Sequence, residues 1–200
     1  DSTRAMTAYG IWDRATKGQD TFTRTSPTRT NLQEQTITEQ ATSNPFSANE
    51  TVQGLRIVSQ NSVLWYDANN NVNKHGWYLD FKVSGATSNT GEMLINPMAA
   101  RGKVLLLNTL TPNANPCREG VDSWLYGLDP TTGGRTNFNV FDLNNDKVID
   151  ANDSVQRNGS STVVSSYKKP GSGGFTTNNG DIYTAPSQGS GMKYSAGPTT

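Results

Sequence analysis

A strand followed by a tight turn is predicted by the run Ser123-Trp-Leu-Tyr-Gly-Leu-Asp129-Pro-Thr-Thr-Gly-Gly134. The apolar patch opens on Trp124 and closes on an Asp, and the Pro and Gly residues that follow favour a turn. A shorter run, Gly76-Trp-Tyr-Leu-Asp80, has the same order of Trp, apolar patch and Asp. Strand and turn units of this kind resemble the outer hairpins of propeller blades, so we expect an all-β fold: a modified β-propeller, or part of one.

Further strand-like segments recur along the chain. They are short, rich in β-branched and aromatic residues, and bounded by Gly, Pro, Asn or Asp. The predicted strands are Met6–Trp12, Leu32–Thr38, Gly54–Ser59, Ser62–Tyr66, Trp77–Val83, Met93–Pro97, Lys103–Thr109, Trp124–Leu128 and Asn137–Phe141. Little helix is expected, and only Leu32–Gln40 has a composition that suits a helix as well as a strand. Residues 13–31 and 40–53 are polar and are predicted to be long loops.

Composition and charge exclude several function classes. Hydrophobic residues make up 32% of the chain, which suits sheets with long polar loops better than a compact globule with a deep interior. Seventeen basic residues balance seventeen acidic ones, so nothing favours binding to nucleic acid or to an anionic membrane. The longest apolar run is strand-sized, so no membrane span is predicted. Because Asp1 is not an initiator residue, we expect the chain to be a piece of a longer mature protein.

A calcium loop is predicted between residues 142 and 153. Oxygen donors at alternate positions of an EF-hand-like loop converge on one ion, and the seventh position contributes a backbone carbonyl, which makes Val acceptable there. Hard oxygen donors without His or Cys favour Ca²⁺ over zinc. No flanking helices are predicted. The predicted metal ligands are Asp142, Asn144, Asp146, Val148 and Asp150.

The loop departs from the usual pattern at two positions. Lys147 occupies the sixth position, where the sharp turn normally takes Gly, so we expect an unusual backbone conformation that costs about 1 kcal/mol. Its charge should also weaken calcium binding. Asp153 occupies the twelfth position and is shorter than the usual Glu, so direct ligation and ligation through water both stay open. An Asx-rich turn without an ion is the alternative interpretation of the loop.

Other chemically suggestive residues favour structural roles. The stretch Asp67–Asn73 has only one carboxylate and is read as an Asn-rich turn between strands. His75 is the only histidine and has no nucleophile motif nearby, so a surface histidine is favoured over a catalytic base. The single cysteine, Cys117, is expected to be structural or to pair outside this segment. No catalytic residue is therefore predicted.

The order of these elements resembles the C-terminal region of the PilC/PilY family of type IV pilus tip-associated proteins. The resemblance covers residues 6–155. The motifs that carry it are Tyr9-Gly-Ile-Trp-Asp13, Gln35-Thr-Ile37, Gly76-Trp-Tyr-Leu-Asp80, Glu92 to Pro97 before Val104–Leu107, Asn115-Pro-Cys117, Trp124-Leu-Tyr126, Thr132-Gly-Gly134, and the stretch from Phe141 to Asp150.

The resemblance implies a function and a place. In this family a calcium loop in the propeller regulates pilus extension and retraction, and the protein acts at the pilus tip in adhesion and twitching motility. It implies that residues 1–155 are the C-terminal part of a propeller. Residues 156–200 are rich in Ser, Gly and Asn, and this composition predicts an extended or flexible segment. Minor pilins, and host or surface ligands, are the implied partners, and the implied location is extracellular, on the bacterial surface.

Two other function classes stay open. The run from Trp124 to Gly134 also resembles repeats of quinoprotein dehydrogenases, which are calcium-dependent propeller enzymes. Those enzymes take their ion ligands from separated strands, whereas the loop 142–153 supplies its ligands from one short stretch and leaves no open position for chemistry. A non-enzymatic protein is therefore predicted. A calcium-stabilised scaffold module without pilus association is the third interpretation.

Overall fold

The computed structural model describes residues 4–13, 28–46, 49, 51–112, 121–169, 174–184 and 192–198. Within these residues the protein is all-β, with only two short 3₁₀ helices, η1 (Arg29–Asn31) and η2 (Ala151–Asp153). The strands are β1 (Thr7–Ile11), β2 (Gln33–Ala41), β3 (Gly54–Val58), β4 (Gly76–Val83), β5 (Met93–Leu94), β6 (Ala99–Arg101), β7 (Val104–Thr111), β8 (Asp122–Leu128), β9 (Val155–Arg157), β10 (Ser160–Thr162), β11 (Ser166–Lys169), β12 (Phe175–Asn178), β13 (Asp181–Thr184) and β14 (Met192–Lys193).

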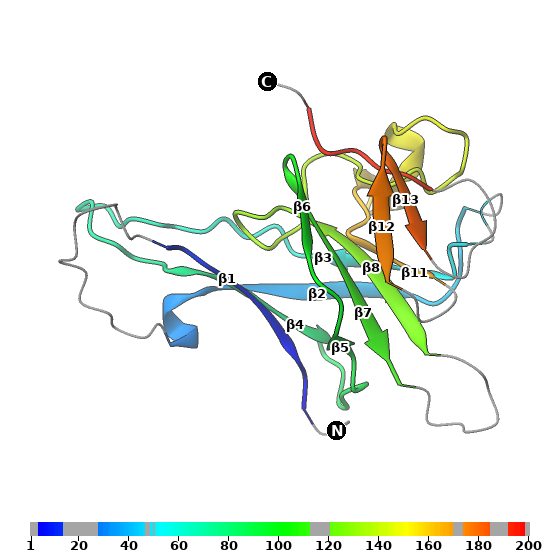
Figure 1. Cartoon of the computed structure of the whole chain (residues 1–200). Coiled ribbons are helices and arrows are strands. Elements are labelled where there is room, and N and C mark those ends of the chain that lie inside the picture. Colours follow the sequence, from blue (N-terminus) through cyan, green and yellow to red (C-terminus); the bar gives the residue numbers. More distant parts are fainter. Residues whose placement is uncertain are drawn as a thin grey trace.

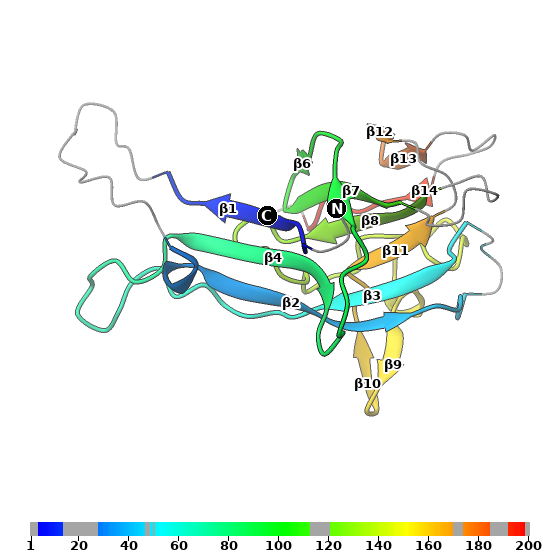
Figure 2. The same cartoon turned by 90° about the horizontal axis from the view of Figure 1, so that it is seen from below.

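One large sheet organises the molecule (Figures 1 and 2). Its strand order is β1-β4-β2-β3-β11-β8-β7-β5, and β6 also pairs with β7. All neighbours are antiparallel except β2 and β4, which are parallel. A hairpin of β9 and β10 and a three-stranded sheet of β12, β13 and β14 complete the described structure.

Both faces of the central strands are buried. Successive side chains of a strand point to opposite faces, and accordingly Leu106 and Leu125 belong to one hydrophobic cluster while Leu107 and Tyr126 belong to the other. All five residues of β3 are buried. This arrangement explains why Val104–Leu107 is a continuous apolar run rather than an alternating one.

The two Trp-containing runs meet in space through a turn. Trp77 lies in β4 and donates a hydrogen bond from its indole nitrogen to the Pro130 carbonyl oxygen at 3.0 Å. Gly133, in the same turn, has a φ of +69°, and a Cβ atom there would lie 2.1 Å from the Trp77 ring. Only a glycine fits this position, since a side chain would meet both backbone strain and the ring. The turn after one run therefore covers the tryptophan of the other.

Most predicted strands coincide with observed ones, but two do not. Ser62–Tyr66 and Asn137–Phe141 form no strand, and each has only an isolated bridge, Tyr66 to Val72 and Phe141 to Tyr194. In the second segment, Val140 and Phe141 are buried in a core without belonging to a ladder. Their apolar character reflects burial alone, which a sequence pattern does not distinguish from strand pairing.

Parts of the segment 156–200, for which an extended or flexible chain is expected, form strands. β11 lies inside the large sheet, between β3 and β8, and β12 to β14 form a sheet of their own. Tyr167 of β11 is buried and packs edge-on against Phe141, with ring centroids 5.1 Å apart. A few well-placed apolar residues thus order a stretch whose average composition is polar. Cys117 and the glycine-rich stretches 170–173 and 188–191 lie outside the described residues.

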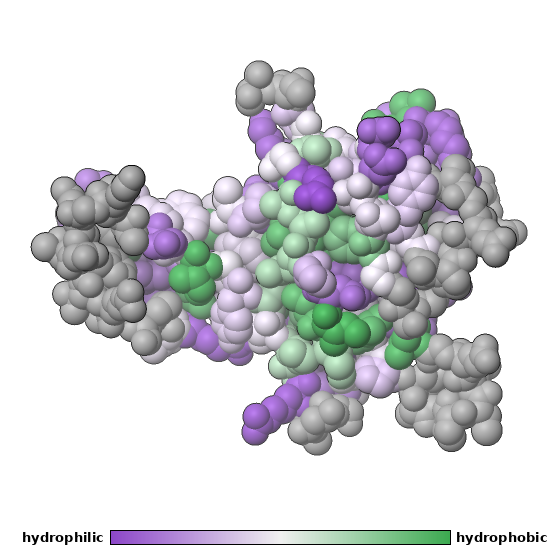
Figure 3. All heavy atoms as spheres, in the orientation of Figure 1, coloured by the Kyte–Doolittle hydropathy of each residue, from purple (hydrophilic) through white to green (hydrophobic). Residues whose placement is uncertain are grey.

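No helix within the described part of the chain is long and apolar enough to cross a membrane. Apolar surface is nevertheless visible over β5, β6 and β7 on the face shown in Figure 3, where Ile95 and Met98 are exposed.

Candidate metal centre

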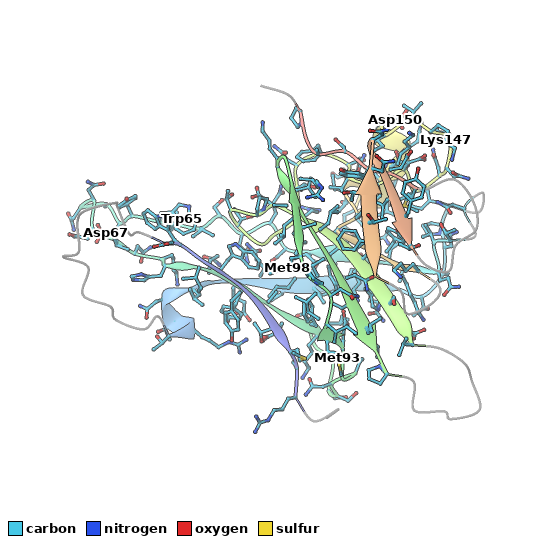
Figure 4. All side chains as sticks on the ribbon, in the orientation of Figure 1. Trp65, Asp67, Met93, Met98, Lys147 and Asp150 are labelled. Atoms are coloured by element: carbon cyan, nitrogen blue, oxygen red, sulfur yellow. The ribbon has the colours of Figure 1, made fainter. Side chains whose placement is uncertain are left out.

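The predicted calcium loop connects the core to β9. Phe141 and Leu143 at its start and Val155 just after its end are all buried in the same hydrophobic cluster. Between these anchors the chain turns outward, so that the residues from Asn145 to Val148 are exposed. Figure 4 places Lys147 and Asp150 at the edge of the molecule, where Figure 3 shows hydrophilic residues. The loop therefore has fixed ends and an accessible tip.

The first three predicted ligands come together. The backbone nitrogen of Asp146 donates to Asp142 Oδ1 at 3.1 Å and to Asn144 Oδ1 at 3.0 Å, so these two side-chain oxygens lie on the same side of the loop. The Asn144 amide nitrogen also donates to Asp146 Oδ2 at 2.9 Å. These hydrogen bonds hold the side chains of Asp142, Asn144 and Asp146 close together within the loop.

Lys147 adopts the expected backbone conformation. Its φ is +74°, in the left-handed region that favours glycine. Its backbone nitrogen donates to Asp142 Oδ2 at 3.0 Å, and its ammonium group donates to Asn145 Oδ1 at 2.5 Å. The prediction of an unusual conformation at this position is confirmed, and the charged group points to a neighbouring amide.

The last predicted side-chain ligand has a different partner. Asp150 caps the 3₁₀ helix η2: its Oδ1 accepts from the Asn152 backbone nitrogen at 2.7 Å, and its Oδ2 accepts from the Asn152 amide at 3.2 Å. Val148 is more than half exposed, so its side chain has no packing role. Across the described residues, no three His, Cys, Asp or Glu side chains gather closely enough to hold a metal on their own. Each Asp150 oxygen accepts one of these bonds, so lone pairs remain on the carboxylate for a further partner.

Asp153 fastens the two ends of the loop. Its Oδ1 accepts from the backbone nitrogens of Leu143 at 2.7 Å and Asn144 at 3.2 Å, and its Oδ2 accepts from that of Asp150 at 3.0 Å. This clasp was not predicted from the sequence. The pattern Asp150-x-x-Asp153 resembles a capping box and carries the signal that would have indicated it.

Two buried carboxylates make the loop electrostatically unfavourable without a cation. Asp142 and Asp153 are each only 1% exposed, and neither forms a salt bridge within the described residues. Burial raises the pKa of Asp153, and the nearby Asp142 raises it further, although three backbone hydrogen bonds oppose the shift. A loop rich in oxygen donors, with the carboxylates of Asp142 and Asp153 buried at its base and an accessible tip, fits the chemistry of a hard divalent cation.

The second acidic turn has the structure expected of an Asn-rich turn. Asp67 Oδ1 accepts from the backbone nitrogens of Asn69 and Asn71, both at 2.8 Å. These bonds occupy the single carboxylate of the turn and lower its pKa. His75 is half-buried, and its backbone joins Asn31 and Trp12 by hydrogen bonds.

An unpredicted buried ion pair joins β3 to the residue that precedes β5. Arg56 of β3 donates from Nη1 to both carboxylate oxygens of Glu92, at 2.8 and 2.7 Å. The two side chains are 3% and 0% exposed. The sequence signal is an arginine between Leu55 and Ile57 in an otherwise apolar strand, because a charged residue buried there needs a partner. Nothing in the sequence identifies Glu92 as that partner.

Comparison with known proteins identifies relatives over the whole chain. No family model matches the sequence. The chain is 44% identical over 202 residues to the type IV pilus biogenesis factor PilY1 of Pseudomonas aeruginosa strain PAO1, and 46% identical over 181 residues to PilY1 of strain UCBPP-PA14. A PilY1 homolog of Xylella fastidiosa is 31% identical over 132 residues, or 64% of the chain. The chain spans 17% of the length of the PAO1 protein.

A solved structure has the same fold. The crystal structure of the P. aeruginosa PilY1 C-terminal domain matches 99% of the chain with a TM-score of 0.84 and 41% sequence identity, and the chain covers 38% of that structure. The all-β propeller fold expected from the sequence is thereby confirmed. The sequence similarity covers the whole of this chain, and the fold is shared. The chain therefore belongs to the PilC/PilY family and corresponds to part of its C-terminal propeller region.

Proposed function

We propose that this chain is the calcium-binding part of a type IV pilus biogenesis protein, and that occupancy of the loop 142–153 regulates pilus extension and retraction. The observation that supports the proposal most directly is the pair of buried carboxylates, Asp142 and Asp153, at a loop that coils around further oxygen donors. Relatives named as pilus biogenesis factors supply the pilus context.

The ligand set that we propose is the one expected from the sequence: Asp142, Asn144, Asp146, the Val148 carbonyl and Asp150. When bound, Ca²⁺ supplies positive charge that balances the carboxylates and ties both halves of the loop to one centre. Asp153 keeps the ends of the loop together through three backbone nitrogens. Its remaining lone pairs leave direct or water-mediated ligation open to it.

We propose that the loop has two arrangements and that calcium binding favours one of them. Asp150 is hydrogen-bonded to Asn152 and caps η2. Calcium binding at Asp150 therefore acts on the same carboxylate that caps η2. Since η2 leads directly into β9, the change reaches a hairpin that lies outside the loop. A ligand shifts such an equilibrium only by its differential affinity for the two arrangements.

The proposed setting is the extracellular pilus tip, where the protein would contribute to adhesion and twitching motility. Minor pilins are the proposed partners, together with host or surface ligands. Among the described residues, no helix has the length and apolar character of a membrane span. A quinoprotein-like dehydrogenase is less well supported, because the predicted ligands come from one loop rather than from separated strands. A calcium-stabilised scaffold without pilus association is the third function. It would be favoured if loss of calcium from the loop left piliation and motility unchanged.

The test is Asp150→Ala in the parent bacterium. Removing one ligand should impair surface piliation or twitching while the protein stays at its normal level, because Asp150 is exposed and no core contact is lost. Asp67→Ala is the matched control, since Asp67 is an acidic residue in another exposed turn. If the Asp150 variant is expressed normally, has lost calcium and still supports normal piliation and motility, the loop has only a structural role.

A further inference from the structure

A small cavity lies at the end of the large sheet, beside Thr111 at the end of β7 and Asp122 at the start of β8. Its volume is about 110 Å³, and the described residues that line it include Gln40, Arg56, Thr111, Trp124 and Lys168. A water molecule occupies about 30 Å³ of liquid, so the cavity has room for about four waters or for a carboxyl group on a short carbon chain. We call it the Arg56 cavity.

The guanidinium group of Arg56 is fixed on three sides. Nε donates to Gln40 Oε1 at 2.7 Å, and Nη1 donates to Glu92 and to the Tyr126 hydroxyl. The Trp124 ring lies under the guanidinium, with its centroid 3.9 Å from Cζ. Nη2 has no hydrogen-bond partner among the described residues. Nη2 is not one of the buried side-chain atoms that lack a partner, although the Arg56 side chain is only 3% exposed, so this donor keeps contact with the solvent of the cavity that Arg56 lines. It is therefore available to a ligand there.

Glu92 cannot serve as that partner. Its Oε1 already accepts from the Thr109 hydroxyl at 2.5 Å and from the Tyr126 hydroxyl at 3.0 Å, in addition to Arg56 Nη1. Both Glu92 oxygens are directed at Nη1, on the protein side of the guanidinium. An acceptor for Nη2 would therefore come from the cavity, outside the buried network.

The mouth of the cavity supplies a second cation and hydroxyl donors. Lys168 and the hydroxyl groups of Thr90 and Thr111 line it. The Lys168 ammonium is 2.9 Å from Asp122 Oδ2, but the Asp122 side chain is 59% exposed, so this ion pair is solvated and weak. An incoming acceptor can displace Asp122 into water at little cost. The charged residues that line the cavity are two cations, Arg56 and Lys168, and one carboxylate, Asp122. The lining therefore carries an excess positive charge, which favours an anionic ligand.

We propose that the Arg56 cavity binds a small carboxylate group, which accepts hydrogen bonds from Nη2 of Arg56 and from the ammonium of Lys168. Charge-assisted bonds of an arginine to a carboxylate are among the strongest in proteins, and the fixed guanidinium loses little freedom on binding. The carboxylate belongs either to a small free acid or to an acidic side chain of a peptide, since both present the same group. This site is separate from the calcium loop and independent of the proposed pilus function.

The test is a titration with acetate and with glutamate blocked at both ends, followed by saturation-transfer NMR of the ligand, with acetamide as the neutral control. Saturable binding of either carboxylate, without binding of acetamide, is expected. Tighter binding of acetate indicates a free acid, and tighter binding of blocked glutamate indicates a peptide side chain. Equal signals from acetate and acetamide, or none from either carboxylate, would overturn the proposal.

Rim variants separate the site from the fold. Because Arg56 belongs to a buried ion pair, its replacement endangers folding, whereas Lys168 and Asp122 are partly exposed. Lys168→Met should weaken binding about tenfold, as expected for one lost charge-assisted bond. Asp122→Asn should tighten it, since a competing carboxylate is removed. Lys82→Met and Asp80→Asn, on β4 and outside the cavity, are the matched controls. Unchanged binding in Lys168→Met would contradict the assignment.

Discussion

Lys147 has two separate effects in the proposed calcium loop: its side chain strains the backbone, and its charge repels a cation. Its φ is +74°, so the backbone at this position is strained for a residue with a side chain. Replacing Lys147 by Gly should therefore stabilise the protein by about 1 kcal/mol through relief of this strain. It should also tighten calcium binding, because a like charge beside the ion is removed.

Two measurements distinguish these contributions. Thermal unfolding without calcium measures the strain, and calorimetric titration with calcium measures the affinity. Lys147→Gln is the control, since it removes the charge but keeps a side chain at the strained position. This variant should bind calcium more tightly than the unmodified protein, with an unchanged free energy of unfolding in the absence of calcium. If Lys147→Gly binds calcium no more tightly than the unmodified protein, the ammonium has a compensating contact that offsets its repulsion.

Lys169 should give the protein a distinctive pH dependence. Its side chain is 1% exposed, and burial lowers its pKa from 10.5 to about 8. Between these two values the unfolded chain binds more protons than the folded one, so stability should rise with pH. The gain is on the order of 3 kcal/mol over the window.

Lys169→Met isolates this contribution. Denaturant unfolding at pH 7.5, 9 and 10.5 would be compared for the two proteins, at about 0.1 M salt to limit surface effects. The difference in unfolding free energy between them should change across the window, since other titrating groups are common to both. A constant difference would mean that Lys169 keeps its ordinary pKa.

Sequence reasoning found the loop residues more readily than their contacts. The alternation of oxygen donors from Asp142 to Asp150 gave the candidate ligands, and the missing glycine gave the left-handed conformation of Lys147. It did not give the cap between Asp150 and Asn152, because the same carboxylate suits a ligand and a helix cap. The Arg56–Glu92 pair was also missed, since its members are 36 positions apart and no local pattern joins them.

The calcium loop is an element whose stability should depend on the ion. Calcium at about 100 times its Kd should add about 2.7 kcal/mol to the free energy of unfolding, which corresponds to roughly 5–10 °C in melting temperature for a chain of this size. Magnesium should do much less, because its smaller octahedral shell suits a flexible ring of carboxylate and amide oxygens poorly.

Melting curves with EDTA, Ca²⁺ and Mg²⁺ check this expectation. Asp142→Asn removes one negative charge from the loop, and it should abolish most of the calcium-induced rise in melting temperature. Asp67→Asn is the control elsewhere, and its response should match that of the unmodified protein. An absent calcium shift, or equal shifts with both ions, would argue against the site.

Among the strands, burial on two faces decided which were predictable. β4 and β7 carry long apolar or aromatic runs and were predicted within two residues of their observed ends. β11 was missed because its four residues, Ser-Tyr-Lys-Lys, contain one apolar side chain and two lysines. Its place is set by pairing with β3 and β8. The first aligned partners of Ser166 are Arg56 and Tyr126, which lie 110 and 40 residues earlier in the chain, so only long-range contacts define the position of β11.

At the scale of the whole molecule, the calcium loop connects two sheets. The Asp142 backbone nitrogen donates to the Lys193 carbonyl oxygen at 3.1 Å, and the Ser195 nitrogen donates to the Val140 carbonyl oxygen at 2.7 Å. Phe141 and Tyr194 form a bridge between the same segments. Ordering of the loop should therefore reach the three-stranded sheet through β14, and it should reach the hairpin through η2 and β9.

Hydrogen exchange with and without calcium tests this path. Calcium should increase protection in residues 139–157 and 192–195, which lie on the connection, and should leave β1 and β4 unchanged, since they lie at the far edge of the large sheet. Asp150→Ala should remove the increase in both segments together, because the cap and the ligand are the same residue. Protection that rises only within residues 142–153 would confine the effect of calcium to the loop. The ion would then have no route through β9 or β14 to other surfaces, and regulation of the pilus would have to act on the loop surface itself.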